Sequence, residues 1–141
     1  MSFKPRSYRD KVIWITGASS GIGAALASAF AAREATLVLS ARRWDRLEAV
    51  RTACAHAERH RILPLDLTEA AAIPTAADLV LSQQGRVDIL VNNGGITQRS
   101  LVKHTQMELD RCIMETNYFG AVALTKAVLP SMLVLSCVGN R

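Results

Sequence analysis

Short apolar runs alternate with longer alanine-rich or amphipathic segments along most of this chain. The runs lie at residues 12–16, 36–40, 61–65 and 88–92. Each run is apolar almost throughout, which is typical of strands covered by helices on both faces of a sheet. The alternation of strand-like and helix-like segments predicts an α/β fold of Rossmann type, with a doubly wound parallel sheet in three layers.

The segments between these runs are predicted to be helical. Helices are expected at residues 21–34, 44–58, 69–84 and 106–132. Pro74 is expected to bend or delay the third helix, and Pro130 to mark a bend or an end in the fourth. A last apolar run at 133–138 is predicted to form a fifth strand.

Length and composition are those of one domain. The chain has 141 residues, half of them hydrophobic, enough to bury a core, so residues 1–141 are expected to form a single unit. The longest apolar stretches are interrupted by charge or glycine before the roughly 18 residues that a membrane helix needs. No signal-type segment follows the basic first ten residues, so we expect a cytoplasmic protein without a membrane partner.

The cysteine content and the charge distribution argue against a disulfide-rich, a zinc-binding and a nucleic-acid-binding protein. Three widely spaced cysteines do not form a disulfide framework, which suits a reducing compartment. The run from Cys54 to His60 lacks the paired spacing of zinc sites, so no metal is expected. The net charge of +5 comes from dispersed basic residues with only 5% aromatics, so we expect no nucleic-acid partner.

A glycine-rich turn, TGASSGIG at 16–23, joins the first strand to the first helix. Gly17 permits the tight turn, Gly21 lets the backbone approach a ligand, and Gly23 lets the helix pack close to the sheet. The helix then presents free N–H groups and the positive end of its dipole. This arrangement predicts a diphosphate-binding site, and the missing Gly-Lys-Ser/Thr ending excludes a P-loop.

The chain resembles the classical short-chain dehydrogenase/reductase family from Lys11 to about Met132. The matching motifs occur in the family's order and at familiar intervals. They are TGASSGIG at 16–23, SARR at 40–43, DLT at 66–68, NNGG at 92–95 and ETNYFG at 115–120.

Cofactor choice is predicted at the end of the second strand. An acidic residue there takes the ribose hydroxyls of NAD, but this chain has Ala41 followed by Arg42 and Arg43. Guanidinium donors without a nearby carboxylate favour a 2′-phosphate, so we expect NADP(H) rather than NAD(H). The alternative is that both arginines are solvated and paired with Asp45 or Glu48.

The resemblance implies further cofactor contacts. It assigns the phosphate mainly to Arg42, with help from Ser40 or Ser19, and the adenine to the Asp66 side chain and the next residue's backbone. The alternative role for Asp66 is a helix N-cap. The implied cofactor-binding residues are Gly17, Ser19, Ser20, Gly21, Ile22, Gly23, Ser40, Arg42, Arg43, Asp66, Leu67, Asn93, Gly94 and Gly95. The family usually has alanine at the position of Gly94, and Asn92 is expected to be structural.

Catalytic residues are only partly present. By resemblance, Asn117 opens its helix locally and holds a water in a proton relay; a capping or surface asparagine is the alternative. Ser136 is the candidate catalytic serine, although it arrives early. The alternatives are that Cys137 takes the catalytic position or that Ser136 is a plain strand residue. The family's Tyr-x-x-x-Lys is missing, because neither Tyr8 nor Tyr118 has a lysine four residues later.

The resemblance implies an oxidoreductase that transfers hydride between NADP(H) and a small-molecule carbonyl or secondary alcohol. Two interpretations stay open: a piece of a longer enzyme, or a natural truncation that binds nucleotide or acts as a scaffold without catalysis. A homo-oligomer, dimer or tetramer, is implied through the long fourth helix.

Overall fold

A four-stranded parallel sheet forms the centre of the molecule. The computed structural model describes residues 7–138, with side chains described up to Val134. The strands are β1 (Val12–Thr16), β2 (Thr36–Ser40), β3 (Arg61–Ile62) and β4 (Ile89–Val91). Their order is β3-β2-β1-β4, and all pairs are parallel. The winding direction therefore reverses between β1 and β4, which confirms the doubly wound sheet.

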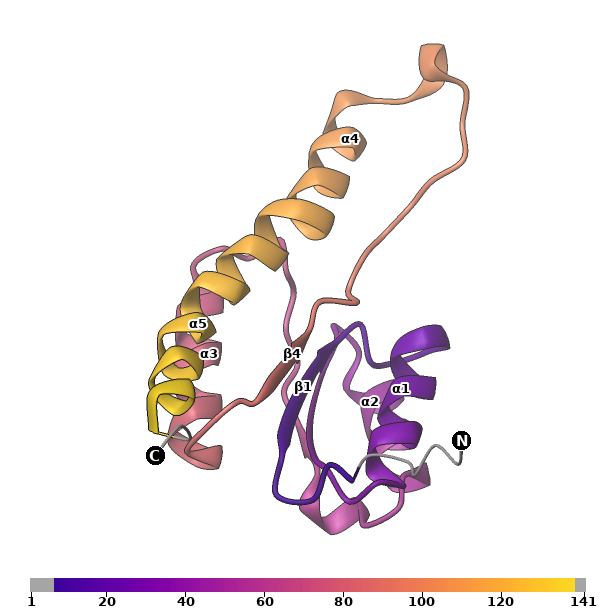
Figure 1. The fold of residues 1–141 in the computed structure, drawn as a ribbon. Helices are drawn as coiled ribbons and strands as arrows, with labels where there is room; N and C mark the ends of the chain where they lie inside the picture. The colour runs from indigo at the N-terminus through magenta and orange to yellow at the C-terminus, as the bar shows by residue number, and fades with distance from the viewer. Residues whose placement is uncertain (1–6, 139–141) are drawn as a thin grey trace, which may run out of the picture.

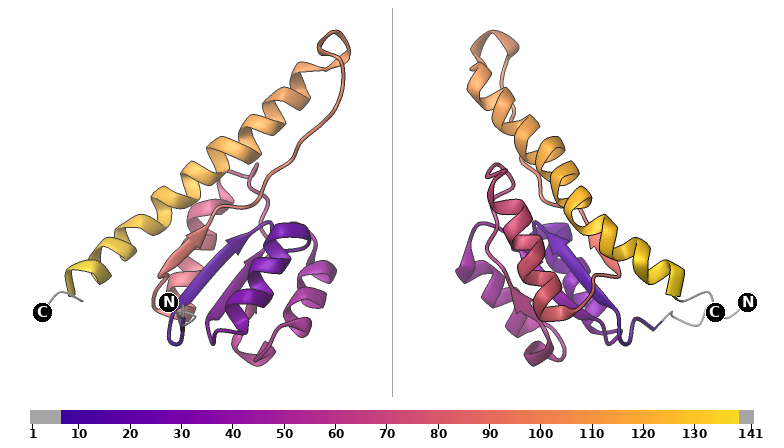
Figure 2. Two further views of the ribbon diagram at one scale, coloured as in Figure 1. Left: turned by 45° about the vertical axis from the view of Figure 1, so that its right-hand side comes forward. Right: turned by 90° about the vertical axis from the view of Figure 1, so that its left-hand side faces the viewer.

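Helices cover both faces of this sheet (Figures 1 and 2). The helical segments are α1 (Gly21–Ala31), α2 (Trp44–Ala53), η1 (Ala57–Arg59), α3 (Ala72–Gln84), η2 (Val102–His104), α4 (Met107–Met114), η3 (Glu115–Phe119) and α5 (Gly120–Val138). The first two α-helices lie on one face, and α3 and α5 pack together on the other. The α4 end of the long helical segment projects beyond the sheet, together with the loop that follows β4 (Figure 1).

Successive side chains of β1 point to opposite faces of the sheet, so the hydrophobic core has two halves. Ile13 and Ile15 are fully buried against the α1 and α2 side. Val12 and Trp14 point to the opposite face and pack with residues of α3 and α5. Both faces are therefore apolar, as expected for a strand in the middle of a covered parallel sheet.

Three predicted helices are shorter than expected, and the first of them, α1, ends at Ala31 rather than residue 34. α2 ends at Ala53 rather than residue 58, and the chain then passes through His56 with a φ of 58°. α3 begins at Ala72 rather than residue 69, so Pro74 lies in its first turn, where a missing N–H breaks no helical hydrogen bond. The predicted delay at Pro74 is confirmed. β3 also ends early, at Ile62.

The predicted fifth strand is wrong, because residues 133–138 continue α5 to Val138. Pro130 lies inside this helix and does not end it. A short apolar run has no periodicity that separates strand from helix. The preceding Ser131 and Met132 provide no turn that would release the chain toward the sheet, while each added helical residue gains a backbone hydrogen bond.

The helical segment Met107–Val134 is long and apolar enough to cross a membrane, judged by length and composition alone. One such helix is weak evidence, because core helices of soluble proteins meet the same criterion. In this fold Leu124 and Val128 are fully buried in the core between the sheet, α3 and α5. Part of the apolar surface of the segment therefore belongs to the core.

Candidate functional site

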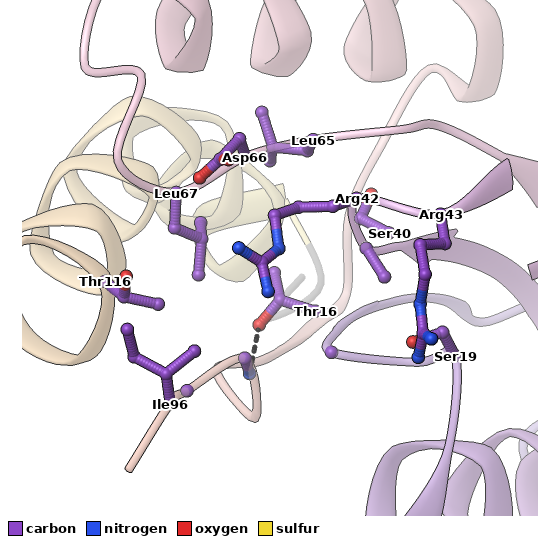
Figure 3. A pocket seen from close by; sticks show the side chains of 14 residues that line it. Thr16, Ser19, Ser40, Arg42, Arg43, Leu65, Asp66, Leu67, Ile96 and Thr116 are labelled. Atoms are coloured by element: carbon purple, nitrogen blue, oxygen red, sulfur yellow. Dashed lines mark hydrogen bonds between the residues drawn. The ribbon is translucent and has the colours of Figure 1, made fainter. Parts of the chain in front are cut away.

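A hollow lies at the carboxyl ends of the strands, where the winding direction reverses (Figure 3). Five separate segments contribute to its wall. The lining residues are Thr16, Gly17, Ser19, Ser40, Ala41, Arg42, Arg43, Leu65, Asp66, Leu67, Gly94, Gly95, Ile96 and Thr116. Ligands of doubly wound sheets bind at this topological position.

The glycine-rich turn leaves β1 beside the hollow, and two of its glycines are required by packing. Gly17 has a φ of 64°, and a Cβ there would lie 2.8 Å from the Cα of Gly94. A Cβ on Gly23 would overlap the carbonyl oxygen of Gly17. Both positions therefore need glycine to bring α1 and the β4 loop against the turn.

Gly21 differs from the other two glycines of the turn. Its φ is 54°, but no described atom lies within 4 Å of the position of a Cβ. The N-cap Ser20 is extended and makes no side-chain cap hydrogen bond, and Ile22 is exposed. The first N–H groups of α1 have no acceptor among the described residues and are therefore free to bind an anion.

The β4 loop is held against this turn by side-chain hydrogen bonds. Thr16 Oγ1 accepts the main-chain N–H groups of Asn93 and Gly94, at 3.1 and 2.9 Å. The Asn93 amide donates to the carbonyl oxygens of Thr16 and Gly17, at 3.1 and 3.2 Å. The Asn93 side chain is therefore occupied in holding the turn. Asn92 donates to Thr125 Oγ1 at 2.9 Å and links β4 to α5.

The two arginines after β2 are free for a ligand. The guanidinium groups of Arg42 and Arg43 make no hydrogen bond or ion pair within residues 7–134. Of their alternative partners, Asp45 lies 4.0 Å from Arg46, and Glu48 pairs with Arg51. Figure 3 shows the Arg42 side chain reaching across the hollow toward Thr16.

Asp66 faces Arg42 across the hollow and is half-buried. Its Oδ1 accepts the main-chain N–H and the hydroxyl of Thr68, at 2.9 and 2.8 Å. The Thr68 N–H lowers the pKa of Asp66, with smaller contributions from the Thr68 hydroxyl and Arg42, while burial opposes them. The Asp66 side chain caps a local turn, since α3 begins only at Ala72. Its Oδ2 accepts nothing from the described residues.

Leu67 fills the space between the β4 loop and the long helix. A Cβ on Gly94 would lie 2.8 Å from the Leu67 Cδ1, and a Cβ on Gly120 would overlap the Leu67 carbonyl oxygen. The glycine at position 94 therefore leaves room for the leucine that lines the hollow. Gly120 lets the start of α5 lie directly on this segment.

The helix widens at Asn117, as the resemblance implies. Residues Glu115–Phe119 form a π-helical turn, in which the Gly120 N–H donates to the carbonyl of Glu115. The Asn117 amide accepts the Ile96 N–H and donates to the Ile96 carbonyl, both at 2.8 Å. These two hydrogen bonds attach the wide turn to the loop that leaves β4.

Ser136 does not join this cluster through a strand. Its backbone belongs to α5, and its side chain lies outside the part that the structure describes. Its assignment as the catalytic serine stays a prediction. Within the described residues, no group of three His, Cys, Asp or Glu is placed to hold a metal ion.

Sequence reasoning missed several contributors to the hollow. Thr16 was considered only as part of a motif, although its hydroxyl organises the β4 loop. Leu65, Ile96 and Thr116 line the hollow but have no chemical signature in the sequence. The sequence motifs of the family identify neither the apolar residues that line the hollow nor the hydrogen bonds that hold its walls in place.

Comparison with known proteins agrees with this arrangement. The sequence profile of the family described as short chain dehydrogenase matches residues 11–139, nearly the whole chain. The chain belongs to the short-chain dehydrogenase family. Members of this family are oxidoreductases that use nicotinamide cofactors.

Relatives of this chain occur in vertebrates and in insects. Human dehydrogenase/reductase SDR family member 7 is 47% identical over 129 residues, which are 88% of this chain and 38% of the relative. A family protein 7-like dehydrogenase/reductase of Drosophila melanogaster is 44% identical over 140 residues, 93% of this chain and 43% of that protein. The chain therefore spans less than half of the length of these relatives.

A solved structure gives the same result. The crystal structure of a short-chain dehydrogenase from Streptomyces avermitilis is 40% identical, with a TM-score of 0.81. The match covers 86% of this chain and 44% of the bacterial one. The short-chain dehydrogenase fold is thus shared over most of this chain.

Proposed function

We propose that this chain forms the NADP(H)-binding part of an oxidoreductase that transfers hydride between nicotinamide and a carbonyl or secondary alcohol. The observation that carries the cofactor choice is the pair Arg42 and Arg43, whose guanidinium groups are unpaired beside the hollow. Position 41, where a carboxylate would bind the ribose hydroxyls of NAD, is alanine. A 2′-phosphate would give these two guanidinium groups a charge-assisted partner.

The diphosphate of the cofactor is proposed to bind the start of α1. The free N–H groups after Ser20 and the open space at Gly21 favour a close anion. The adenine is proposed to lie between Asp66 and the main chain at Leu67. Oδ2 of Asp66, which has no described partner, is available to accept an amino group.

Catalytic roles for Asn117 and Ser136 belong to the same proposal. Asn117 lies in a π-helical turn that is attached to the cofactor-side loop at Ile96. This attachment keeps the turn next to the hollow, as a water relay requires. Ser136 lies 19 residues further along the same helical segment, roughly 28 Å from Asn117 at the α-helical rise, so its proposed role in polarising the substrate carbonyl requires the chain to leave the helix before that serine.

Cofactor titration tests the proposal directly. Calorimetric titration of the chain with NADPH and NADH is expected to show tighter binding of NADPH. Arg42→Ala is expected to weaken NADPH about tenfold, the loss of one charge-assisted contact, and to leave NADH nearly unchanged. Arg46→Ala is the matched control, because Arg46 pairs with Asp45 and does not line the hollow. Preference for NADH would contradict the cofactor assignment.

The chain by itself is expected to bind NADPH without turning over carbonyl substrates. Its two tyrosines, Tyr8 and Tyr118, are not followed by a lysine four residues later, so a general acid activated in that way is missing. Consumption of NADPH with a panel of aldehydes and ketones, followed at 340 nm, checks this expectation. Turnover by the chain alone would contradict it.

A further inference from the structure

A buried tryptophan in β1 makes a hydrogen bond to a side chain on the wall of the hollow. Trp14 is fully buried, and its indole Nε1 donates to Ser40 Oγ at 2.9 Å. Ser40 is the last residue of β2 and only 1% exposed, yet it lines the hollow beside Arg42. The two residues connect the core of the sheet with the cofactor site.

The chemistry of the indole determines how the hydroxyl is used. An indole N–H can only donate, so the Ser40 oxygen accepts it and the hydroxyl proton is left for another partner. No residue in the described part of the chain accepts that proton. The Ser40 carbonyl is also engaged, because it accepts the Ala18 N–H at 3.1 Å. The one unused polar function of Ser40 is thus a donor at the wall of the hollow.

Strand register keeps the tryptophan in place. Trp14 pairs with Val38, and Thr16 pairs with Ser40, so Trp14 and Ser40 extend from the same face of neighbouring strands, two residues apart. The Trp14 ring packs in the core half that includes Val12 and Leu124. The ring is fully buried in this closely packed core, which holds the direction of its N–H.

We propose that Trp14 is a positioning residue that directs the Ser40 hydroxyl proton toward the 2′-phosphate of the adenosine ribose. This inference rests on the proposed NADP(H) function. The hydroxyl adds a directed neutral donor to the charges of Arg42 and Arg43, which line the same hollow. A tryptophan in the core thereby contributes to cofactor selectivity without touching the cofactor.

Spectroscopy on the unaltered chain gives the first test. In nitrogen-15 NMR spectra, adenosine 2′,5′-bisphosphate is expected to move the Trp14 indole N–H resonance further downfield than ADP does. A Ser40 oxygen whose proton is donated to a phosphate accepts more strongly, because hydrogen bonds in a chain polarise one another. Equal displacement by the two ligands would overturn the proposal.

Binding by variants gives the second test. Trp14→Phe is expected to lower the preference for the bisphosphate over ADP about three- to tenfold, as for a weakened hydrogen bond to a charged group. In the Ser40→Ala background the same substitution is expected to leave the preference unchanged. Trp44→Phe is the control, since Trp44 is exposed at the start of α2.

The outcomes separate the two levels of inference. The positioning role is wrong, and the cofactor proposal stands, if the unaltered chain prefers the bisphosphate but Trp14→Phe weakens the binding of both ligands equally. The same conclusion follows if Trp14→Phe still lowers the preference for the bisphosphate in the Ser40→Ala background. If the unaltered chain binds both ligands equally, both proposals are wrong. If Trp14→Phe does not fold, the NMR titration of the unaltered chain decides.

Discussion

Thr16 Oγ1 accepts the main-chain N–H groups of two consecutive residues, Asn93 at 3.1 Å and Gly94 at 2.9 Å. Thr16 ends β1, and the other two residues follow β4. One buried hydroxyl therefore sets the position of the β4 loop relative to the glycine-rich turn. Both segments line the hollow, so the shape of the site depends on this contact.

Thr16→Val is expected to lower the free energy of unfolding by about 1–3 kcal/mol. The substitution keeps the shape but leaves the partly buried Gly94 N–H without an acceptor, and the Asn93 N–H keeps only the Val91 carbonyl, at 3.0 Å. Urea unfolding measures the loss. Thr16→Ser, which retains the hydroxyl, serves as the control and is expected to remain within about 1 kcal/mol of the unaltered chain. Equal losses in the two variants would show that the hydroxyl contributes nothing.

Gly21→Ala is expected mainly to weaken NADPH binding, whereas Gly23→Ala is expected mainly to lower the stability of the fold. Gly21→Ala should fold, with about 1–2 kcal/mol of strain from its positive φ, and should weaken NADPH binding at least about tenfold, because the methyl group enters the space left for the diphosphate. Gly23→Ala should lose about 3 kcal/mol or more of stability, because its Cβ overlaps the Gly17 carbonyl. Thermal unfolding and NADPH titration separate the effects. A Gly21→Ala chain with unaltered affinity would contradict the assigned ligand position.

His60 is expected to make stability pH-dependent in the weakly acidic range. Its Nδ1 accepts the Leu37 N–H at 3.3 Å, so Nε2 carries the proton and donates to the Ala55 carbonyl at 2.8 Å. Burial lowers the pKa of His60 below 6.5, and the Ala55 contact opposes this only in part. The unfolded chain therefore binds the extra proton more readily, so stability is full above about pH 6.5 and falls as the pH drops below it.

Urea unfolding at pH 7.5 and pH 5.5 checks the role of His60. This interval lies above the titration of the carboxylates, so the histidine effect is isolated. His60→Asn is expected to remove most of the difference, whereas His56→Asn, at an exposed position, should retain it. Stability that rises on acidification would contradict the sign.

Asn117 variants are expected to change the protection of the Ile96 amide. Asn117→Leu removes the acceptor of the Ile96 N–H and should speed its hydrogen exchange about five- to tenfold, as for a lost hydrogen bond of roughly 1 kcal/mol. Asn117→Asp keeps the acceptor oxygen and loses only the donor to the Ile96 carbonyl. Its Ile96 amide should stay protected. NMR-detected exchange measures both, and equal rates in the two variants would exclude the contact.

Much of the fold was predictable, because apolar strands and glycine turns leave local signals. β1 and β2 occur at their predicted residues, since each is an uninterrupted apolar run. The same reasoning failed at residues 133–138, where an equally apolar run continues a helix. The runs are similarly apolar in the two situations, and the missing turn before Leu133 separates them.

Within the candidate site, the polar residues that line the hollow could be predicted, but the hydrogen bonds that hold them in place could not. Arg42 and Asp66 follow strands whose carboxyl ends meet at one edge, so their convergence on the hollow follows from topology. The bond from Trp14 to Ser40 depends on the register of two strands whose paired residues are 24 positions apart along the chain. No local pattern encodes that register.

The π-helical turn at Glu115–Phe119 also determines which residues of α5 enter the core. A turn that holds one extra residue rotates every later side chain by about 100° relative to an unbroken α-helix. With that rotation, Leu124 and Val128 occupy the fully buried positions. In a regular helix the same direction would fall to Ala123 and Ala127, whose methyl groups would leave the space half empty. The π-helical turn beside the hollow thus determines which side chains of α5 pack in the core about two turns further along.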